Sequence, residues 1–356
     1  MEWAKPEGYS KKRVDWAGNI LINKTSSEED RDKAICILDN WRAIHRYPMH
    51  IFKKRLKNVS EKIDKDAFTV QRLKRLPSII KKLQRVYQGN KPTMKLSQMQ
   101  DIAGCRVVMP TIKQARELYE KHYIRGHIKH PRINEKDYMM IPKKDGYRSI
   151  HLIYRYNSDK GKKDFNDLLI EVQIRSKLQH LWATAIEIVD FFTKQAIKSN
   201  EGQKEWIDFF RLVSSVFAII EKTPTIPGTS RNKKELYSQI KVQEEKLQVI
   251  NVMTGWAHAI KVFQEVTKEK PNVQFFLLEL DVGEGRLNLR TYTKEQEKIA
   301  ILNYDQAEKR NQGKEAYDVV LVGADTTNDL KKAYPNYFVD SEEFLEKLQQ
   351  IINKAK

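Results

Sequence analysis

The sequence predicts an α+β fold in which a mixed β-sheet flanked by helices is followed by a second, small α+β domain. Three observations support this prediction. Short segments rich in β-branched and aromatic residues lie between longer segments of helical periodicity. The excess positive charge is confined to the first part of the chain. A segment with two prolines and a glycine, residues 222–232, separates the two parts, so we expect domains at residues 1–225 and 226–356.

Helices are expected at the start of the first domain. Residues 26–63 begin with serine caps and early acidic residues, and Pro48 indicates that this range holds two helices. Residues 69–87 also follow a helical pattern, in which Pro77 predicts a break or a restart.

Strands are expected next, because runs of β-branched and aromatic residues are bounded there by Gly, Pro, Asn and Asp. These runs are residues 102–109, 148–156 and 168–174, and a polar hairpin connection joins the last two. Helical spacing returns after Arg175, and a further helix closes the domain at Glu221.

The second domain has its own alternation of elements. A helix over about residues 233–265 leads into a hairpin with a Gly-Glu-Gly turn, followed by a helix over 294–312, a strand over 318–324 and a terminal helix. From residue 233 onward the chain has no cysteine and a single histidine, His258, so we predict no metal site in this domain.

Composition sets limits on the class of protein. At 356 residues the chain can bury a core in each of two domains. Lys and Arg equal Asp and Glu from residue 231 onward, at 20 each, so the net charge of +18 lies in the first 230 residues. Such a basic field attracts polyanions. Solubility is the alternative explanation, but the confinement of the charge to one part of the chain favours phosphate binding. Two cysteines build no disulfide framework, and no apolar run reaches the roughly 18 residues of a membrane helix, so we expect a cytoplasmic protein.

Two carboxylates are candidate magnesium ligands. Glu171 lies inside an apolar strand, where an ionised group is costly unless it binds a metal or a cation. Gln173 and Arg175 project to the same strand face. Asp101 stands where a strand begins, and a turn or cap residue is the alternative explanation. Two carboxylates and a triphosphate are sufficient to hold Mg²⁺.

Several cations could bind phosphates. If the helix continues through Pro77, Lys74, Ser78 and Lys82 share one of its faces, although such a face is often simply solvated. Arg106 lies inside a strand of small apolar residues, where a guanidinium favours a phosphate or carboxylate partner.

The segment from Pro142 to His151 lacks the spacing of a Walker motif. It nevertheless combines Lys143 with Tyr147, whose ring could stack on a base, and with the imidazole of His151. The alternative is that Tyr147 is an ordinary strand residue.

Four separated motifs occur in order along the chain. They are R-x-K-x-x-x-S-I-x-x-K from Arg72, D-I-x-G-x-R from Asp101, D-Y-x-x-x-P-K-x-x-G-Y-x-S-I-H from Asp137, and E-V-Q-I-R from Glu171. Over about residues 65–195 this order resembles the synthetase domain of the RelA/SpoT family. The resemblance implies a nucleotidyltransferase-like fold and Mg²⁺-dependent transfer of pyrophosphate from ATP to a ribose hydroxyl.

The same resemblance implies residue roles. Asp101 and Glu171 would be the catalytic residues and the metal ligands, with Glu171 also a candidate general base. The ATP contacts would be Arg72, Lys74, Ser78, Lys82 and Arg106. The acceptor contacts would be Lys143, Tyr147, His151, Gln173 and Arg175. Asp145 stands where the family usually has Asn in its guanine-binding loop.

A longer pattern, made of SKKRVDWAGNIL, NWRAIHRYP, LQHLWATAIE and AYPNYFVDSEEF, resembles the toxic small alarmone synthetases, and most closely fused toxin–antitoxin proteins of the CapRel type. The resemblance implies pyrophosphorylation of the 3′-terminal adenosine of tRNA CCA ends, which blocks aminoacylation and translation. It also implies an antitoxin domain that inhibits the enzyme, with Tyr334 and Tyr337 at the nucleotide site, until a phage protein such as capsid releases it. By their charge alone, Lys11, Lys12 and Arg13 are candidate tRNA contacts.

Other interpretations remain open at the level of sequence. An alarmone synthetase that makes ppGpp, pppGpp or ppApp is the main alternative enzyme. A catalytically silent RNA-binding regulator is an alternative of another class, and both proposed carboxylates argue against it. Tyr334 and Tyr337 could also be core residues beside a proline turn.

Overall fold

The computed structural model describes residues 3–86, 92–195, 202–270, 272–281, 286–311, 317–323 and 337–355. Packing divides the chain into two compact units. The first unit is Met1–Tyr138 with Ser149–Lys177, and the second is Met139–Arg148 with Leu178–Lys356. The chain therefore enters the second unit twice. A division by packing does not test where the functional modules divide, so the boundary between residues 225 and 226 stays a prediction.

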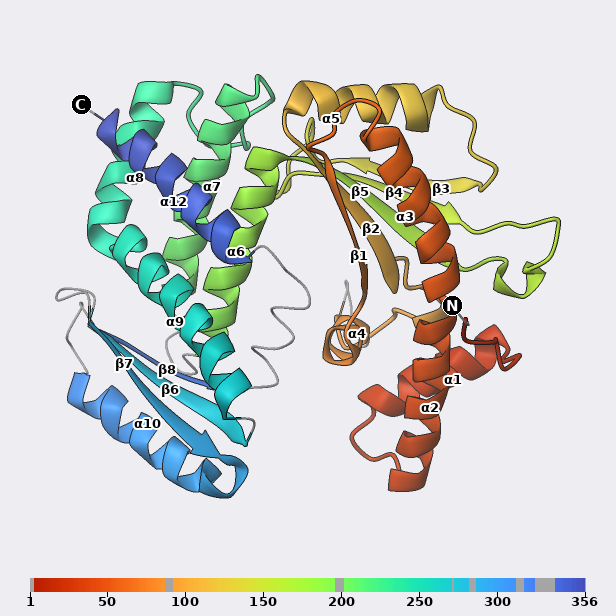
Figure 1. The fold of residues 1–356 in the computed structure, drawn as a ribbon, viewed down its shortest axis with the longest axis horizontal. Coiled ribbons are helices and arrows are strands. Elements are labelled where there is room, and N and C mark those ends of the chain that lie inside the picture. Colours follow the sequence, from red (N-terminus) through yellow and green to blue (C-terminus); the bar gives the residue numbers. More distant parts are fainter. Residues whose placement is uncertain are drawn as a thin grey trace. The chain divides into compact units, whose positions relative to one another are not determined.

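The first unit combines helices with a mixed sheet (Figure 1). Its helical elements are α1 (Lys11–Ile22), α2 (Glu28–Ile44), α3 (Arg46–Ser60), α4 (Leu76–Leu83), η1 (Leu96–Gln98), α5 (Ile112–Leu118), η2 (Tyr119–Ile124) and η3 (Lys163–Phe165). Its strands are β1 (Phe68–Leu73), β2 (Ala103–Met109), β3 (Arg132–Asp137), β4 (Ile150–Arg155) and β5 (Leu169–Ser176). In space the strands follow the order β1-β2-β5-β4-β3.

The pairing of these strands confirms the predicted mixed sheet. β2 and β5 run parallel in the middle, whereas β1 pairs antiparallel with β2, and β4 pairs antiparallel with both β5 and β3. The polar residues between β4 and β5 form the hairpin connection that was expected there. In the parallel pair, Gly104 lies beside Glu171 and Arg106 beside Gln173.

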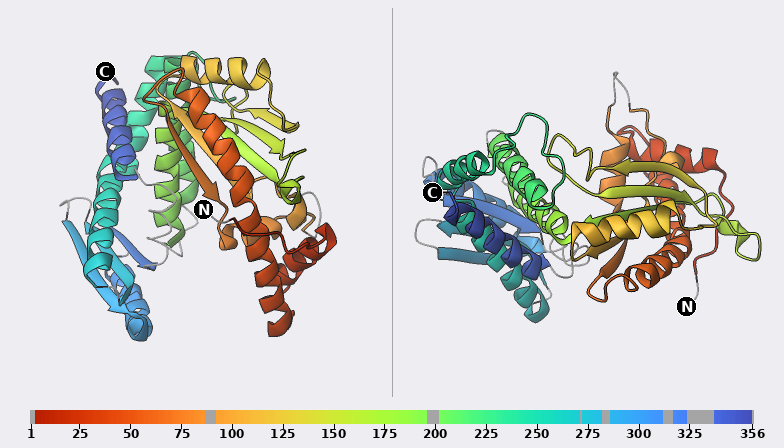
Figure 2. Two further views of the ribbon diagram at one scale, coloured as in Figure 1. Left: turned by 45° about the vertical axis from the view of Figure 1, so that its right-hand side comes forward. Right: turned by 90° about the horizontal axis from the view of Figure 1, so that it is seen from above.

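One face of this sheet is apolar and carries the core. Cys105 and Val107 of β2 and Val172 and Ile174 of β5 are buried there. Helices α3 and α5 contact these strands, and both lie on the same side of the sheet (Figure 2, right). Because side chains alternate along a strand, the residues between these core positions point to the other face.

The segment after α3 departs from the expected helix. Residues 69–73 belong to the edge strand β1, and a helix begins only at Leu76. The prediction of helix from residue 69 was therefore wrong. Charged residues at helical spacing are compatible with an edge strand, and pairing with β2 decides the conformation. Pro77 lies in the first turn of α4, where its missing N–H has no helical partner to lose.

The second unit contains a helical bundle and a smaller sheet (Figure 1). Its helical elements are α6 (Lys177–Gln195), α7 (Gly202–Ile220), α8 (Lys233–Leu247), α9 (Val249–Glu269), η4 (Lys294–Gln296), α10 (Glu297–Asn311) and α12 (Tyr337–Asn353). Its strands are β6 (Val273–Asp281), β7 (Arg286–Thr293) and β8 (Tyr317–Gly323), in the order β7-β6-β8. The hairpin of β6 and β7 and the predicted second α+β module are thereby confirmed.

Alternation along β6 builds two cores on the two faces of this sheet. Phe276, Leu278 and Leu280 join a large aromatic core with the bundle helices. Leu277 instead faces α10, where Ala300 completes a small separate cluster. Figure 1 shows α9 and α10 on opposite sides of the three strands.

Helix α9 spans 21 residues and carries Lys261, Glu265 and Glu269. Such charges are unfavourable in a bilayer. Throughout the part of the chain that the structure describes, no helix combines the length and the apolarity needed to cross a membrane.

Candidate active site

The polar face of the first sheet gathers the charged residues that the sequence singled out. Direct strand neighbours place Arg72 of β1 next to Gly104 of β2, and Gly104 next to Glu171 of β5. The next row contains Arg106 and Gln173, and His151 of β4 follows. Paired residues share a face of the sheet, so these side chains converge on one surface.

Asp101 lies immediately before β2 and is held by two lysines. The Nζ atom of Lys74 donates to Oδ2 and the Nζ atom of Lys82 donates to Oδ1, both at 2.8 Å. The Asp101 side chain is 25% exposed, so these ion pairs are partly shielded from water. Two predicted ATP contacts thus meet the predicted metal ligand.

The route by which these lysines meet differs from the one expected. Lys74 lies between β1 and α4, whereas Ser78 and Lys82 lie on α4, four residues apart. A shared helix face was expected only if one helix continued through Pro77, and this condition is not met, because α4 begins at Leu76. The strand, the turn and the short helix nevertheless bring Lys74 and Lys82 to one carboxylate.

Glu171 is held in the middle of the polar face by His151 and by the side-chain amide of Gln173. Its Oε1 lies 2.7 Å from Nδ1 of His151, and its Oε2 accepts from Nε2 of Gln173 at 2.7 Å. Burial raises the pKa of Glu171, and the nearby Asp101 charge acts in the same direction, but the contacts with His151 and Gln173 outweigh both and lower it. Glu171 is therefore a carboxylate at neutral pH.

Gln173 connects Glu171 to two arginines. Its Oε1 accepts from Nε of Arg106 at 3.0 Å and from Nη2 of Arg175 at 3.2 Å, while its amide group donates to Glu171. This pattern fixes the orientation of the Gln173 amide, because its two ends meet opposite partners. The expected convergence of Glu171, Gln173 and Arg175 is confirmed, and Arg175 is buried in it.

The donor set suits a magnesium ion carried by a nucleotide. Asp101 and Glu171 offer hard oxygen ligands, and the negative charge of Asp101 acts to raise the pKa of Glu171. Among the residues that the structure describes, no three His, Cys, Asp or Glu side chains could hold a metal by themselves. A magnesium–nucleotide complex needs only one or two protein carboxylates, because phosphates and water supply the other ligands.

Acidification should weaken the Asp101 ion pairs. Burial favours the neutral acid, but Lys74 and Lys82 hold the pKa of Asp101 below its ordinary value. Such a group contributes stability that is fully present above its unfolded pKa, about 4, and is lost as the pH falls through the folded pKa. We expect wild type to resist urea better than Asp101→Asn at pH 7, and this difference to shrink below about pH 4. A difference that stays constant with pH would contradict the ion pairs.

The loop with Lys143 and Tyr147 belongs to the second unit. Tyr147 packs against the core of that unit, and Nζ of Lys143 lies 4.7 Å from the centre of its ring. The backbone N–H of Tyr147 donates to Oδ1 of Asp145 at 3.0 Å. An asparagine could accept the same hydrogen bond, so Asp145 preserves this turn.

Arg148 anchors this loop from within. Its guanidinium donates to Oγ of Ser214 at 3.1 Å and to the carbonyl oxygens of Met139 at 3.2 Å and Pro224 at 2.7 Å. The hydroxyl of Ser214 in turn donates to the carbonyl oxygen of Gly146 at 2.6 Å. The partners of Arg148 are therefore groups of the second unit itself, and its role there is structural.

Replacing Gly146 with alanine should destabilise the second unit. Gly146 has φ +99°, and an added Cβ would lie 2.9 Å from Cζ2 of Trp182 and 3.1 Å from Cβ of Ser214. Gly228→Ala is the matched control, because Gly228 also has a positive φ of +84° but no heavy atom within 4 Å of the added Cβ. We expect Gly146→Ala to lower the free energy of unfolding by about 1–3 kcal/mol more than Gly228→Ala in urea titrations. Equal losses would show that the loop adjusts without strain.

Strand β3 adds residues that the sequence analysis missed. Lys136 is the direct partner of His151, and the Tyr138 ring lies edge-on to the His151 ring with centroids 5.3 Å apart. Nδ2 of Asn134 donates to Oε1 of Gln100 at 3.2 Å. The polar alternation of residues 132–138 could have identified this strand, but its low content of apolar residues concealed it.

The remaining predicted residues lie elsewhere. Lys11, Lys12 and Arg13 form the exposed first turn of α1, and the guanidinium of Arg13 lies 4.0 Å from the centre of the Trp16 ring. Tyr334 lies outside the described residues. Tyr337 is the first residue of α12, and its side chain also lies outside the described part.

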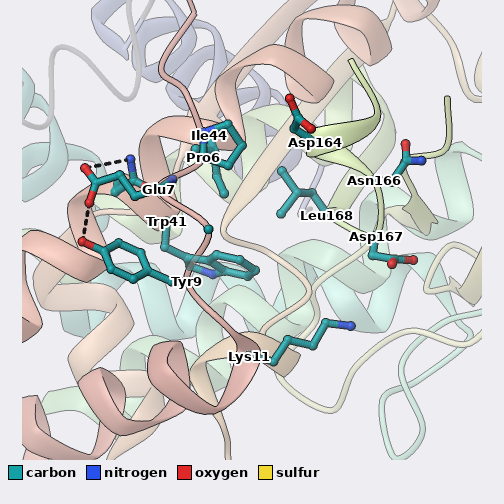
Figure 3. Close-up of a pocket in the computed structure, with 12 residues that line it drawn as sticks. Pro6, Glu7, Tyr9, Lys11, Trp41, Ile44, Asp164, Asn166, Asp167 and Leu168 are labelled. Carbon is teal, nitrogen blue, oxygen red and sulfur yellow. Dashed lines mark hydrogen bonds between the residues drawn. The ribbon is translucent and has the colours of Figure 1, made fainter. Parts of the chain in front are cut away.

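A pocket of about 220 Å³ in the first unit contains none of these polar-face residues (Figure 3). Trp41, Ile44 and Leu168 form apolar walls, and Glu7 bridges Tyr9 and Asn40 at one side. Three carboxylates and one lysine, Lys11, line it, so its charge opposes a polyphosphate. The lining residues are Pro6, Glu7, Gly8, Tyr9, Lys11, Asn40, Trp41, Ile44, Asp164, Asn166, Asp167 and Leu168. The geometry of the polar face, and not this pocket, therefore defines the candidate site.

Residues 71–189 match the family described as a region found in RelA / SpoT proteins. The matched range contains Arg72, Asp101 and Glu171, so the similarity to RelA / SpoT proteins covers the candidate site.

Two proteins of Bacillus subtilis (strain 168) are similar to this chain. GTP pyrophosphokinase YjbM is 25% identical over 181 residues, which cover 50% of this chain and 80% of that protein. GTP pyrophosphokinase YwaC is 27% identical over 173 residues, which cover 48% of this chain and 72% of that protein. Among solved structures, small alarmone synthetase 1 from Bacillus subtilis bound to its product pppGpp is 21% identical with a TM-score of 0.43, covering 52% of this chain and 93% of that one.

Proposed function

We propose that the chain transfers pyrophosphate from ATP to the 3′-hydroxyl of a guanosine nucleotide. The observation that carries this proposal is the arrangement of Asp101 with two lysines and of Glu171 with His151 on one sheet face. The two relatives named GTP pyrophosphokinase support the choice of acceptor. The preserved turn at Asp145 is compatible with that acceptor.

The proposed reaction exchanges one phosphoanhydride bond for a phosphoester bond. The 3′-oxygen of the acceptor loses its proton, to Glu171 or to water, and bonds to the β-phosphorus of ATP. The bond from that phosphorus to the oxygen bridging the α-phosphate breaks, and AMP leaves. Lys74, Lys82, Arg72 and Arg106 would neutralise the negative charge on the phosphates. A magnesium ion held by Asp101 and Glu171 would draw further charge from the same phosphate oxygens.

Two roles are open to Glu171, and its charge favours one of them. A carboxylate with a lowered pKa is a weak base but a good ligand for a hard cation. Metal ligation is therefore the role that its surroundings support best. Acceptance of the 3′-hydroxyl proton is the second role, and it would require the pKa of Glu171 to rise in the substrate complex.

A tRNA acceptor is the second candidate, and the charge distribution favours it. The net charge of +18 lies in the first 230 residues, and Lys11, Lys12 and Arg13 are exposed at the start of α1. In this version the enzyme modifies the 3′-terminal adenosine of the CCA end. Inhibition by the C-terminal domain and release by a phage capsid-like protein belong to the same candidate, and Tyr334 and Tyr337 are the proposed inhibitory residues.

Incubation with ATP labelled in the γ-phosphate tests both candidates. Purified full-length chain receives Mg²⁺ and either GDP, GTP, ATP or total tRNA, and products are separated by thin-layer chromatography and denaturing gels. Label in a guanosine nucleotide supports the proposal, and label in tRNA favours the second candidate. Label in ATP-derived ppApp would point to the adenine alarmone. If no acceptor carries label, either with or without the phage capsid-like protein proposed as the trigger, pyrophosphate transfer is rejected.

A further inference from the structure

All four oxygens of the two site carboxylates are engaged by protein groups. Lys82 donates to Oδ1 of Asp101 and Lys74 to Oδ2, each at 2.8 Å. His151 lies 2.7 Å from Oε1 of Glu171, and Gln173 donates to its Oε2 at 2.7 Å. The carboxylates that would bind a metal are therefore already bound to neighbouring side chains of the protein.

The two carboxylates differ in the charge of their partners. Two ammonium groups surround one carboxylate at Asp101, so the local charge there is positive. Each ammonium group also occupies one of the directions from which a cation could approach an oxygen of Asp101. A divalent cation is repelled from such a cluster, and partial burial reduces screening by solvent.

We propose that Lys74 and Lys82 keep divalent metal off Asp101 until the polyphosphate of a nucleotide draws the two ammonium groups away. The proposal rests on the assigned pyrophosphokinase function, because it makes ATP the group that exchanges with Asp101. A triphosphate carries several negative charges and offers each ammonium group a stronger partner than one shared carboxylate. Metal and nucleotide then enter together.

The backbone around Lys74 permits this exchange without movement of the chain. Its N–H donates to the carbonyl oxygen of Ile102 at 2.7 Å, and its own carbonyl oxygen accepts from Nε of Arg42 at 3.0 Å. Lys82 lies in the last turn of α4. Only the flexible side chains need to swing, and lysine side chains have several rotatable bonds with low barriers.

The exchange makes metal and nucleotide binding mutually dependent. If nucleotide raises the affinity of Asp101 for metal, metal must raise the affinity for nucleotide by the same factor. Lys74 and Lys82 would thus have two duties, which are to hold phosphate when nucleotide is bound and to block the metal site at other times.

Manganese titration of the full chain, read by the electron paramagnetic resonance of free Mn²⁺, tests the proposal without measuring activity. Without nucleotide, the variant Lys74→Met/Lys82→Met should bind one Mn²⁺ at least about tenfold more tightly than wild type. Adding Asp101→Asn to this variant should abolish the gain. Lys81→Met is the matched control, since Lys81 is the exposed neighbour on α4 and should leave Mn²⁺ affinity at the wild-type value.

A second arm tests the effect of nucleotide. The single variant Asp101→Asn should bind Mn²⁺ with the same affinity as wild type when no nucleotide is present. In the presence of a non-hydrolysable ATP analogue, it should bind Mn²⁺ more weakly than wild type. The single variants Lys74→Met and Lys82→Met should give smaller gains than the double variant, and circular dichroism establishes that each variant is folded. If the double variant does not fold, the single variants carry the test.

Two results would overturn the proposal. One is a lysine variant that binds Mn²⁺ no more tightly than wild type, and the other is a gain that survives Asp101→Asn. The proposed function fails separately, in the labelled-ATP assay of wild type. If the lysine variants gain metal binding but wild type forms no product, Lys74 and Lys82 would still control metal binding at Asp101, but the site would serve a different reaction.

Discussion

Replacing Glu171 with glutamine should reduce pyrophosphate transfer by about 10²–10⁴-fold, the range measured for groups that move a proton in catalysis. The substitution keeps the size of the side chain but removes its negative charge from the centre of the polar face. Contacts with His151 and Gln173 can re-form, so we expect a folded protein. Initial rates with saturating ATP, GTP and Mg²⁺ provide the measurement.

The metal dependence of Glu171→Gln separates the two roles of this residue. If Glu171 is a ligand, the variant should need more Mg²⁺ to reach its reduced rate. If it is only a base, the Mg²⁺ requirement should stay at the wild-type value. Glu117→Gln, at a half-buried carboxylate on α5 that pairs with Lys121, should have wild-type activity. A Glu171→Gln enzyme within tenfold of wild type would remove Glu171 from the reaction.

Replacing Phe344 with alanine should lower the free energy of unfolding of the second unit by about 3–5 kcal/mol. Phe344 of α12 is completely buried. Its ring stacks on Phe210 with centroids 5.6 Å apart and meets Phe217 edge-on at 6.3 Å. Removing this ring leaves a cavity among residues of α7 that cannot all move inward, because each is also packed against other helices.

Urea titration followed by tryptophan fluorescence measures this loss, because Trp182, Trp206 and Trp256 report on the second unit. Glu346→Ala is the control on the same helix, since Glu346 is exposed, and it should change the free energy of unfolding by about 0.5 kcal/mol or less. A loss near that of the control would mean that α12 does not contribute to this core.

The central strands were predictable from sequence, whereas the edges of the sheet were not. β2, β4 and β5 are buried on at least one face, so their runs of β-branched residues stand out. β1 and β3 are edge strands, and β3 is largely polar whereas apolar and polar residues are equally frequent in β1. Their conformation is decided by pairing with segments distant in the sequence, which a local pattern does not contain.

The candidate site was predictable to a similar extent. Strand alternation was sufficient to place Glu171, Gln173 and Arg175 on one face. That Gln173 joins Arg106 to Glu171 depends on the parallel register of β2 and β5, which the sequence does not specify. The loop with Tyr147 packs on Trp182, Ser214 and Ile226, and no motif indicates contacts over that sequence separation.

Because the chain enters its second unit twice, the positions at which two such proteins can be joined in a chimera are restricted. Residues 139–148 are covalently flanked by the first unit, yet Arg148 and Gly146 are fitted to α7 and to the residues that follow it. A chimera joined at residue 225 would inherit this loop and α7 from one parent but Ile226, which adjoins Gly146, from the other. A breakpoint after Asn232 would keep the loop, α7 and Ile226 from one parent, but Phe344 of α12 would then come from the other parent and would have to fit Phe210 and Phe217 of α7.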